Sequence, residues 1–435
     1  MTTTDITTSA ADALEPMLTS LLGEQMPVRF VFWDGSSVGS GEHSVVVNSP
    51  DALRHLLWAP GELGFARAFV LGELDADGPL DGDLGETLRA LQSSMPRTIG
   101  VAATALPSLL SAARTVGALG GPPSAPPEEI VPRGLRHSLS RDRQAVSHHY
   151  DVGNDFYRIV LGPSMTYSCA RFVDDDTDLA AAQAAKHELI CRKLGLDEPA
   201  FRAACGSRPR LLDVGCGWGS MAIHAAQHHD VEVVGITISA EQATLARQRV
   251  EEAGLTDRVE IRLQDYREIH DGPFDAISSI GMAEHVGSKN MARYCADLYE
   301  LLRGGGRLMN HAIASIGGSR ISSRSFVGRY VFPDGELLDL ADTIQALEGA
   351  GFEVRDVENL REHYAKTLRH WVANLEQHWD DAADLVGERR ARVWRLYMSG
   401  SINGFVDNGL QLYQTLAVRS ERQPTDLPPT RRGWD

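Results

Sequence analysis

A glycine-rich loop between a short apolar strand and a helix constrains this chain more than any other feature. Residues 213–219 read Asp-Val-Gly-Cys-Gly-Trp-Gly, after a strand expected at 210–214 and before a helix expected at 221–228. Glycines carry no Cβ, so a backbone rich in them can turn sharply and approach a ligand closely. The loop therefore predicts a strand–turn–helix unit with a ligand seated at the turn.

Strands and helices alternate after this loop. Further strands are expected at 231–236, 259–263, 274–279 and 307–313. Helices are expected at 239–253, capped by Ser239, and at 291–302, ended by the glycines at 304–306. Beyond residue 338, amphipathic stretches at 341–350, 364–378 and 383–417 predict helices. The predicted fold class is α/β, a Rossmann-like domain with a parallel-type central sheet, helices on both faces and a helical C-terminal lid.

A smaller α+β domain is expected before a linker. Strands at 27–33 and 44–48 and a helix at 51–58, capped by Ser49 or Asp51, make up the N-terminal part. Residues 96–135 are rich in Ala, Gly and Pro, which predicts a linker carrying one apolar helix near 99–118. Since 435 residues exceed one small core, we expect an N-terminal domain over 1–95, a linker over 96–135 and the main domain over 136–435.

The loop spacing resembles the first motif of S-adenosylmethionine-dependent methyltransferases. Its glycines fall at 215, 217 and 219 and position 220 is Ser, so the dinucleotide fingerprint is only partly met. Another nucleotide, or a purely structural turn, is the alternative. The acid usually found after the second strand is absent, so Thr237 and Gln242, or Glu241 reaching back, are predicted to hold the ribose. Asp265, after the third strand, is predicted to accept a hydrogen bond from the adenine amino group.

Motifs in a fixed order extend the resemblance. They are His149-Tyr-Asp151, Thr166-Tyr-Ser-Cys-Ala170, the glycine loop, Gly281-Met-Ala-Glu-His285, Asn310-His-Ala-Ile313 and His363-Tyr-Ala-Lys-Thr-Leu368. Together they resemble the cyclopropane-fatty-acyl-phospholipid synthase family, which includes the mycolic acid cyclopropane synthases. Residues 136–420 carry the close resemblance. Residues 20–90 are similar, more loosely, to the extra N-terminal domain of the phospholipid-acting members, which favours unsaturated phospholipid acyl chains as substrate.

The resemblance implies two co-reactants, S-adenosylmethionine and a bound bicarbonate. The implied bicarbonate ligands, which are the predicted catalytic residues, are Cys169, Glu284, His311, the backbone of Ile313, and Tyr364. The predicted cofactor-binding residues are Tyr167, Ser168, Asp213, Gly215, Gly217, Gly219, Thr237, Ile238, Gln242, Asp265 and Tyr266. His285 is predicted to support the site or to be structural, and no metal is expected.

The chemistry implied by the family explains these residue types. Attack of an alkene on a sulfonium methyl group leaves a carbocation, which water would quench, so the site must be dry. A base near the new methyl group then closes a cyclopropane ring. A hydride shift before proton loss gives instead a methylene branch, which a separate reductase would convert to a methyl branch. Ala283, where relatives often carry Phe, and Asn310, where Leu is common, leave both products open.

The formal charge of −17 disfavours a nucleic-acid partner. No apolar run reaches the length of a membrane span and the N-terminus lacks a signal pattern, so we expect a cytoplasmic enzyme peripheral to the inner membrane face. Two segments are candidates for that contact, the basic and apolar stretch 320–333 and the linker near 99–118. A homodimer is a further expectation left open. The competing hypotheses are a methyltransferase for a non-lipid substrate and a non-catalytic lipid carrier.

Overall fold

A computed structural model describes residues 8–76, 83–94, 99–130, 152–322, 324–333 and 335–421, together with 425, 427, 430 and 434. The side chains of 99–106 and of Arg320 are outside this description. The first family motif, at 149–151, and a basic cluster of the linker, Arg133 to Arg143, also lie outside the described residues.

The chain divides into two compact units. One comprises residues 1–131, 324–331 and 379–403, and the other comprises 132–323, 332–378 and 404–435. Both units are therefore discontinuous in sequence, since a short helix and two C-terminal helical segments pack with the N-terminal residues. The sequence-based division at 95 and 135 stays a prediction.

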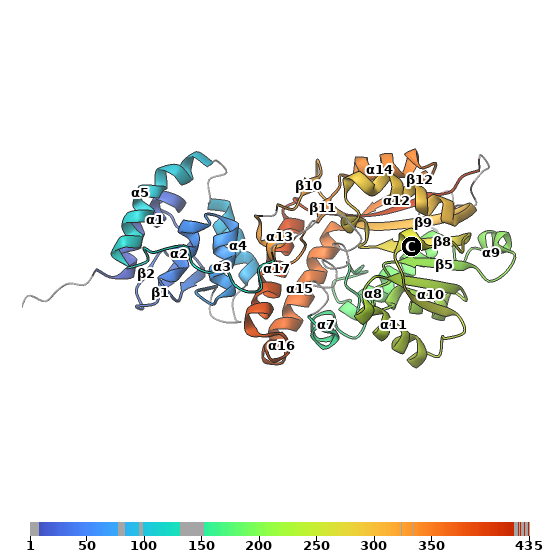
Figure 1. The fold of residues 1–435 in the computed structure, drawn as a ribbon, viewed down its shortest axis with the longest axis horizontal. Helices are drawn as coiled ribbons and strands as arrows, with labels where there is room; N and C mark the ends of the chain where they lie inside the picture. The colour runs from blue at the N-terminus through green and yellow to red at the C-terminus, as the bar shows by residue number, and fades with distance from the viewer. Residues whose placement is uncertain are drawn as a thin grey trace, which may run out of the picture. The chain divides into compact units, whose positions relative to one another are not determined.

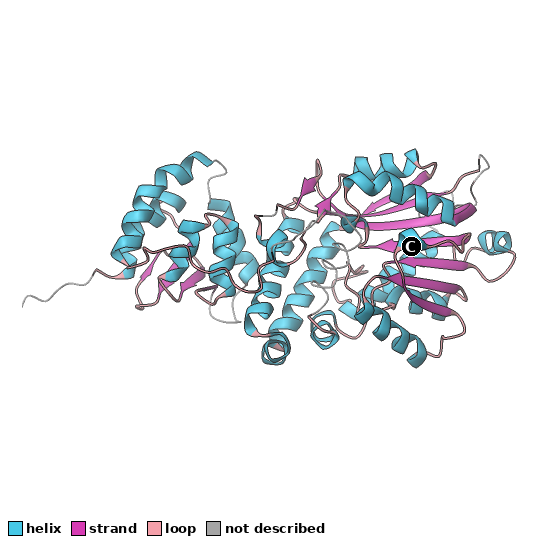
Figure 2. Ribbon diagram, viewed as in Figure 1, coloured by secondary structure: helices cyan, strands magenta, loops and turns pink. Residues whose placement is uncertain are grey.

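The first unit joins a small sheet to several helices (Figure 2). Its strands are β1 (Val28–Phe32), β2 (Ser37–Val38), β3 (His43–Val47) and β4 (Leu74–Ala76), ordered β2-β1-β3-β4. Its helices are α1 (Ala10–Leu22), α2 (Asp51–Trp58), α3 (Glu62–Val70), α4 (Leu84–Ser94), α5 (Ile99–Thr115), α13 (Phe326–Tyr330), α16 (Trp379–Val386) and most of α17 (Glu388–Val406). Apolar residues of α1, β1, β3 and α5 form one core, so the predicted strand–strand–helix order and the helix near 99–118 are present.

A seven-stranded sheet forms the centre of the second unit (Figure 1). Its strands are β5 (Arg210–Val214), β6 (Glu232–Thr237), β7 (Val259–Leu263), β8 (Phe274–Ile280), β9 (Leu302–Ala314), β12 (Glu353–Asn359) and β13 (Gln411–Val418). The order is β12-β13-β9-β8-β5-β6-β7. The five strands from β9 to β7 are parallel, whereas β13 and β12 run antiparallel to their neighbours.

Helices cover both faces of this sheet. They are α7 (Asn154–Leu161), α8 (Leu179–Leu194), α9 (Pro199–Cys205), α10 (Ser220–His228), α11 (Ala240–Glu252), α12 (Ser288–Leu301), α14 (Leu340–Gly349) and α15 (Arg361–Gln377). Successive strand residues alternate between two cores, because side chains of a strand point to opposite faces. Leu211 packs with α8, α10 and α11, and Leu212 packs with α12 and α14. Short elements η1 (Tyr266–Glu268), η2 (Ala283–His285), β10 (Ser319–Arg320) and β11 (Glu336–Leu337) complete the unit.

The predicted α/β fold class is confirmed, but two secondary-structure predictions are wrong. The stretch 383–417 is not one helix, since α17 ends at Val406 and β13 begins at Gln411. The intervening Asn408 has a φ of 63° and is followed by Gly409, a turn signal that the helical periodicity obscured. The glycines at 304–306 do not end a helix, because α12 ends at Leu301 and the glycines belong to β9.

The predicted membrane contact of the segment 320–333 stays a prediction. Within that segment, Phe326 is only 5% exposed and its ring packs against Tyr330. In the part of the chain that the structure describes, no helix combines the length and apolarity required to cross a membrane.

Candidate active site

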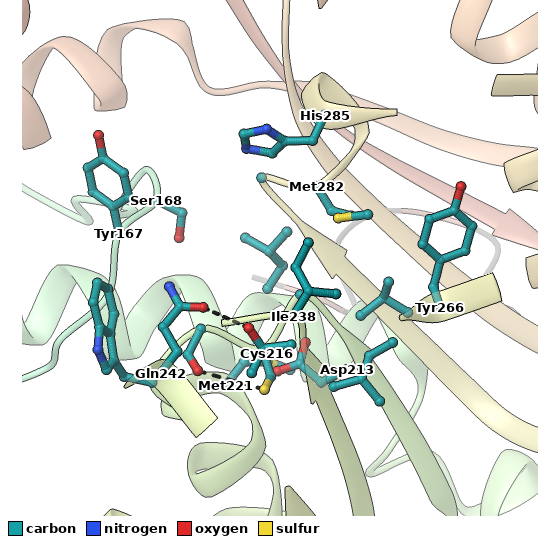
Figure 3. Close-up of a pocket in the computed structure, with 18 of the residues that line it drawn as sticks. Tyr167, Ser168, Asp213, Cys216, Met221, Ile238, Gln242, Tyr266, Met282 and His285 are labelled. Atoms are coloured by element: carbon teal, nitrogen blue, oxygen red, sulfur yellow. Dashed lines mark hydrogen bonds between the residues drawn. The ribbon is translucent and has the colours of Figure 1, made fainter. Parts of the chain in front are cut away.

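A pocket opens at the carboxyl ends of the parallel strands, where ligands of open α/β sheets bind. The glycine loop after β5, the residues after β6 and β7, and the segment Ile280 to Met282 after β8 all line it. Figure 3 shows Tyr167 and Ser168 on one side of this pocket and Met282 and Tyr266 on the other. The topology thus converts four chain segments distant in sequence into one site.

The glycine loop has the geometry that its sequence predicts. Gly215, Gly217 and Gly219 have φ values of 76°, 54° and 81°, a region that side chains with a Cβ rarely adopt. The amides of Gly215 and Cys216 donate to the carbonyl of Ile236, at 3.0 and 2.9 Å, which ties the loop to β6. The loop therefore needs its glycines for backbone shape, and α10 begins directly after it at Ser220.

Ten of the eleven predicted cofactor-binding residues line the pocket. They are Tyr167, Ser168, Asp213, Gly215, Gly217, Thr237, Ile238, Gln242, Asp265 and Tyr266. Gly219 does not line it and serves instead as the N-cap of α10. The sequence reasoning passed over Lys186, His187 and Met282, which also line the pocket, and left His285, a further lining residue, as supporting or structural.

The polar groups proposed for ribose and adenine are paired with neighbours. Thr237 Oγ1 donates to Gln242 Oε1 at 2.8 Å, so each fixes the other. Both carboxylate oxygens of Asp265 accept from the Arg267 side chain, at 2.8 and 2.7 Å. A carboxylate can accept further hydrogen bonds, so Asp265 keeps acceptor capacity toward an adenine, with its direction set by Arg267.

Asp213 presents a buried carboxyl group at the start of the loop. Its Oδ1 accepts from Ser278 Oγ at 2.7 Å, while Oδ2 has no hydrogen-bond partner among the described residues. Burial raises the pKa of Asp213 to about 6, against the opposing effects of Ser278 and of the Lys186 charge. A ligand ammonium group at Oδ2 would satisfy that oxygen and favour the ionised form.

Glu284 and Ile313, two of the five predicted anion ligands, are bonded to each other. Glu284 Oε1 accepts from the Ile313 backbone amide at 2.7 Å, and Oε2 is buried without a partner among the described residues. Burial raises the pKa of Glu284 to about 7. The backbone of Ile313 was predicted to hold the anion; in the structure its amide donates to Glu284 and orients that carboxyl group.

His311 lies on β9, two residues before Ile313 and therefore on the same face of the strand. The side chain is 1% exposed, with Nδ1 lying 3.2 Å from Gln414 Nε2. Within the described chain its Nε2 has no hydrogen-bond partner. Burial, together with the positive charges of Lys186 and Lys193, holds the pKa of His311 well below its ordinary value, so the ring is neutral.

Cys169 lies against the start of α15, the helix that carries Tyr364. The Cys169 thiol is fully buried and lies 3.7 Å from the Leu360 carbonyl, which also accepts the Tyr364 amide. Burial raises the pKa of Cys169, so the group is a thiol. Tyr364 is 8% exposed, and both its ring and that of Tyr167 contact Trp371.

Lys186 places a buried amine in the wall of the cofactor pocket. Its Nζ lies 2.9 Å from Ser168 Oγ and 3.1 Å from His187 Nε2, and the side chain is fully buried. Burial lowers the pKa of Lys186 to about 7, while Cys169 and Asp213 oppose that change. The positive charge of Lys186 also lowers the pKa of His311. Among the described residues, none of the five predicted catalytic residues lines the pocket itself, although Ser168, Gly281, Met282 and His285 beside them do.

One cluster elsewhere in this unit has the side chains of a metal site. Cys191, His224 and His229 offer ligand atoms within 4.8 Å of one another. However, His229 Nδ1 is 2.6 Å from Asp197 Oδ1, and Nε2 is 2.9 Å from Glu188 Oε2, which also lies 3.3 Å from His224. Within the described residues, these carboxylates are hydrogen-bond partners of both imidazoles.

A glycine loop at the head of a parallel sheet, with ribose-side polar groups after the second strand, defines an S-adenosylmethionine-dependent methyltransferase. Residues 137–415 match the family model described as mycolic acid cyclopropane synthetase. The chain belongs to this family, which confirms the resemblance drawn from its motifs.

Relatives and solved structures agree with this assignment. The chain is 43% identical over 423 residues to the probable fatty acid methyltransferase Rv3720 of Mycobacterium tuberculosis, covering 94% of this chain and 95% of the relative. Identity is 32% to the tuberculostearic acid methyltransferase UfaA1 of the same organism, with 94% and 92% covered. It is 33% to the cyclopropane-fatty-acyl-phospholipid synthase of Escherichia coli, with 88% and 89% covered.

The crystal structure of mycolic acid cyclopropane synthase CmaA1 complexed with SAH and CTAB matches with a TM-score of 0.58 and 31% identity, covering 65% of this chain and 99% of that one. This similarity, together with the pocket geometry, supports S-adenosylmethionine as the methyl donor.

Proposed function

We propose that this enzyme transfers a one-carbon unit from S-adenosylmethionine to the cis double bond of an unsaturated acyl chain in a membrane phospholipid, closing a cyclopropane ring with the help of bound bicarbonate. The observation that carries the proposal is that two buried polar atoms, Glu284 Oε2 and His311 Nε2, have no hydrogen-bond partner among the described residues. Met282 and His285, close to Glu284 in the chain, and Ile280, opposite His311 in the sheet, line the cofactor pocket. A buried polar atom without a partner is costly, and such atoms mark sites completed by a ligand.

The residues fit a small protonated anion such as bicarbonate. A neutral His311 can donate from a protonated ring nitrogen, and Glu284 can accept from an anion's hydroxyl group. The Cys169 thiol and the Tyr364 hydroxyl are further hydrogen-bond donors, and burial raises the pKa of Cys169, so the thiol keeps its proton at neutral pH. When bound, bicarbonate would supply a base for the proton lost from the new methyl branch.

The side chains of this site have three tasks in the proposal. The Ile313 amide holds Glu284 in one orientation, because it is bonded to Oε1 at 2.7 Å. The apolar walls contributed by Met165, Ile236 and Met282 exclude water, which would otherwise quench a carbocation. Asp213, whose Oδ2 has no hydrogen-bond partner in the described part of the chain, would bind the ammonium group of the methyl donor.

The alternative product is a methylene-branched chain, which a separate reductase would convert to a methyl branch. The relative named cyclopropane-fatty-acyl-phospholipid synthase and the relative named tuberculostearic acid methyltransferase have similar identities to this chain, 33% and 32%. Asn310 was one of two residues expected to leave both products open. As the neighbour of His311 in β9, it points to the opposite face of the sheet from His311. We retain ring closure as the first product and the methylene branch as the second. A non-lipid acceptor is the third possibility.

Lipid analysis of an expression host tests the proposal and separates its alternatives. The host should contain monounsaturated phospholipids and no enzyme of this kind, and its fatty acids are analysed by gas chromatography with mass spectrometry. A cyclopropane acid supports the first product and a methylene-branched acid the second. Unchanged fatty acids, with S-adenosylmethionine still bound in calorimetry, would overturn the lipid substrate. Absence of cofactor binding would instead favour a lipid carrier.

Membrane contact is proposed at the first unit, near the end of α5. Trp58, Leu110 and Leu119 are 54%, 45% and 49% exposed. Trp58 Nε1 donates to the Gly120 carbonyl at 3.1 Å, which places the indole next to Leu119. Exposed aromatic and aliphatic groups of this kind bind at lipid interfaces. Sedimentation with phospholipid vesicles should decrease for Trp58→Ala plus Leu119→Ser, whereas unchanged sedimentation would remove this surface from the proposal.

A further inference from the structure

A row of side chains crosses four adjacent strands of the large sheet and ends at the cofactor pocket. Glu358 of β12 pairs with Gln414 of β13, Gln414 pairs with His311 of β9, and His311 pairs with Ile280 of β8, which lines the pocket. Directly opposite residues of neighbouring strands place their side chains on one face. Gln414 and His311 are 0% and 1% exposed, so their polar contacts lie inside the protein.

Lys193 determines which way the Gln414 amide points. Lys193 Nζ lies 3.2 Å from Asp356 Oδ2 and contacts a carboxylate oxygen of Glu358, so it is an ammonium group between two carboxylates. It also donates to Gln414 Oε1 at 3.1 Å. An ammonium group has only donors, so the amide oxygen must face Lys193 and the amide NH2 must face the other way.

The other side of the Gln414 amide faces His311. Gln414 Nε2 lies 3.2 Å from His311 Nδ1, and an amide NH2 group can only donate. His311 Nδ1 therefore accepts and carries no proton. In a neutral imidazole the proton must then be on Nε2, the atom that is buried without a partner in the described chain.

We propose that Gln414, oriented by Lys193, is a positioning residue that fixes His311 as the Nε2–H tautomer and so presents a neutral hydrogen-bond donor to the anion site. If His311 were an imidazolium, its Nδ1–H would face the Gln414 amide NH2, donor against donor. Gln414 therefore also disfavours the protonated, charged form of His311. A neutral donor stabilises an anion without adding a positive charge to the site. A positive charge there would oppose binding of the cationic sulfonium of the methyl donor. The role of the donor rests on the proposed function, whereas the tautomer does not.

The tautomer can be measured directly. The protein is labelled with 15N-histidine and the ring nitrogens are recorded by long-range proton–nitrogen NMR, in which protonated and unprotonated nitrogens are well separated. The chain has 15 histidines, so His311→Gln identifies the signal by its loss. We expect Nε2 protonated and Nδ1 unprotonated near neutral pH. A protonated Nδ1 in the wild-type protein would overturn the proposal, whatever the outcome of the lipid assay.

A matched pair of variants tests the role in the reaction. Glu at position 414 has only acceptor oxygens, so Gln414→Glu should move the proton to Nδ1 and leave Nε2 as an acceptor. We expect kcat to fall at least tenfold, with the KM for S-adenosylmethionine within about twofold of wild type. The control is Gln411→Glu, three residues earlier on the same strand, where Gln411 contacts Asn359 and Asn408 instead.

The two kinds of failure are distinguishable. If the wild-type protein has no lipid activity but His311 has the predicted tautomer, the proposed function fails, whereas the positioning of His311 by Gln414 stands. If Gln414→Glu keeps full activity although the His311 tautomer has changed, the positioning of His311 by Gln414 has no role in catalysis. If Gln414→Glu does not fold, Lys193→Met replaces it, because loss of the ammonium group frees the amide to rotate and should give a mixture of tautomers.

Discussion

Replacing Glu284 by Gln should stabilise the protein at alkaline pH and should lower its rate of lipid modification. Gln retains a carbonyl oxygen for the Ile313 amide, now bonded to Glu284 at 2.7 Å, and differs mainly by lacking an ionisable group. Burial raises the pKa of Glu284 from 4.5 to about 7 in the folded protein. Because the folded-state pKa lies above the unfolded one, ionisation costs folding free energy, so wild type loses stability as the pH rises from 4.5 through about 7.

The magnitude follows from the two pKa values. With about 1.4 kcal/mol for each tenfold change in proton affinity, the cost of the ionised carboxylate is about 1 kcal/mol at pH 5 and about 3 kcal/mol at pH 8.5. The free energy of unfolding of Glu284→Gln, relative to wild type, should therefore rise by about 2 kcal/mol between these pH values. Below pH 4.5 the two proteins should differ little.

Urea titration followed by tryptophan fluorescence, without cofactor, measures this difference. The control is Glu300→Gln, an exposed glutamate of α12, which should show no such dependence on pH. In the lipid assay, Glu284→Gln should lose about 10- to 150-fold in rate, the range for a hydrogen bond to a charged group. An equal stability difference at pH 5 and 8.5 would refute the buried titrating carboxyl, and activity within twofold of wild type would remove Glu284 from the site.

Three further outcomes are expected. Calorimetry should show that S-adenosylmethionine binds wild type more weakly as the pH falls through about 6, because burial raises the pKa of Asp213 to about 6. Asp213→Asn should bind the cofactor weakly and without this dependence on pH. A dependence retained in the variant would contradict the assignment of Asp213. Iodoacetamide at pH 8 should not alkylate Cys169 in the native protein, since burial raises its thiol pKa, but should do so in urea; rapid native labelling detected by peptide mass spectrometry would show an open site. Gly219→Ala should lower the free energy of unfolding by about 1 kcal/mol or more. The reason is that the φ of residue 219 is 81° and the new Cβ would lie 3.3 Å from the Ala246 Cβ. An unchanged urea midpoint would show that the loop does not need this backbone conformation.

Local patterns were sufficient where one short segment determines the outcome. The strand at 210–214, the helix capped by Ser239 and the glycine loop follow from apolar periodicity, capping and backbone freedom, and the structure contains all three. Periodicity failed at β13, because a strand buried along nearly its whole length carries no alternation of apolar and polar residues.

The sequence by itself determined the parallel βα unit, the cofactor loop and the types of side chain available for an anion site, since each depends on residues close together in the chain. Only the tertiary structure decided which polar atoms are left without partners. Glu284 meets the Ile313 amide, and Lys193 reaches His311 through Gln414, across separations of 29, 221 and 103 residues. Hydrogen-bond satisfaction and burial depend on every neighbour in space, and strand order, which no local pattern encodes, selects those neighbours.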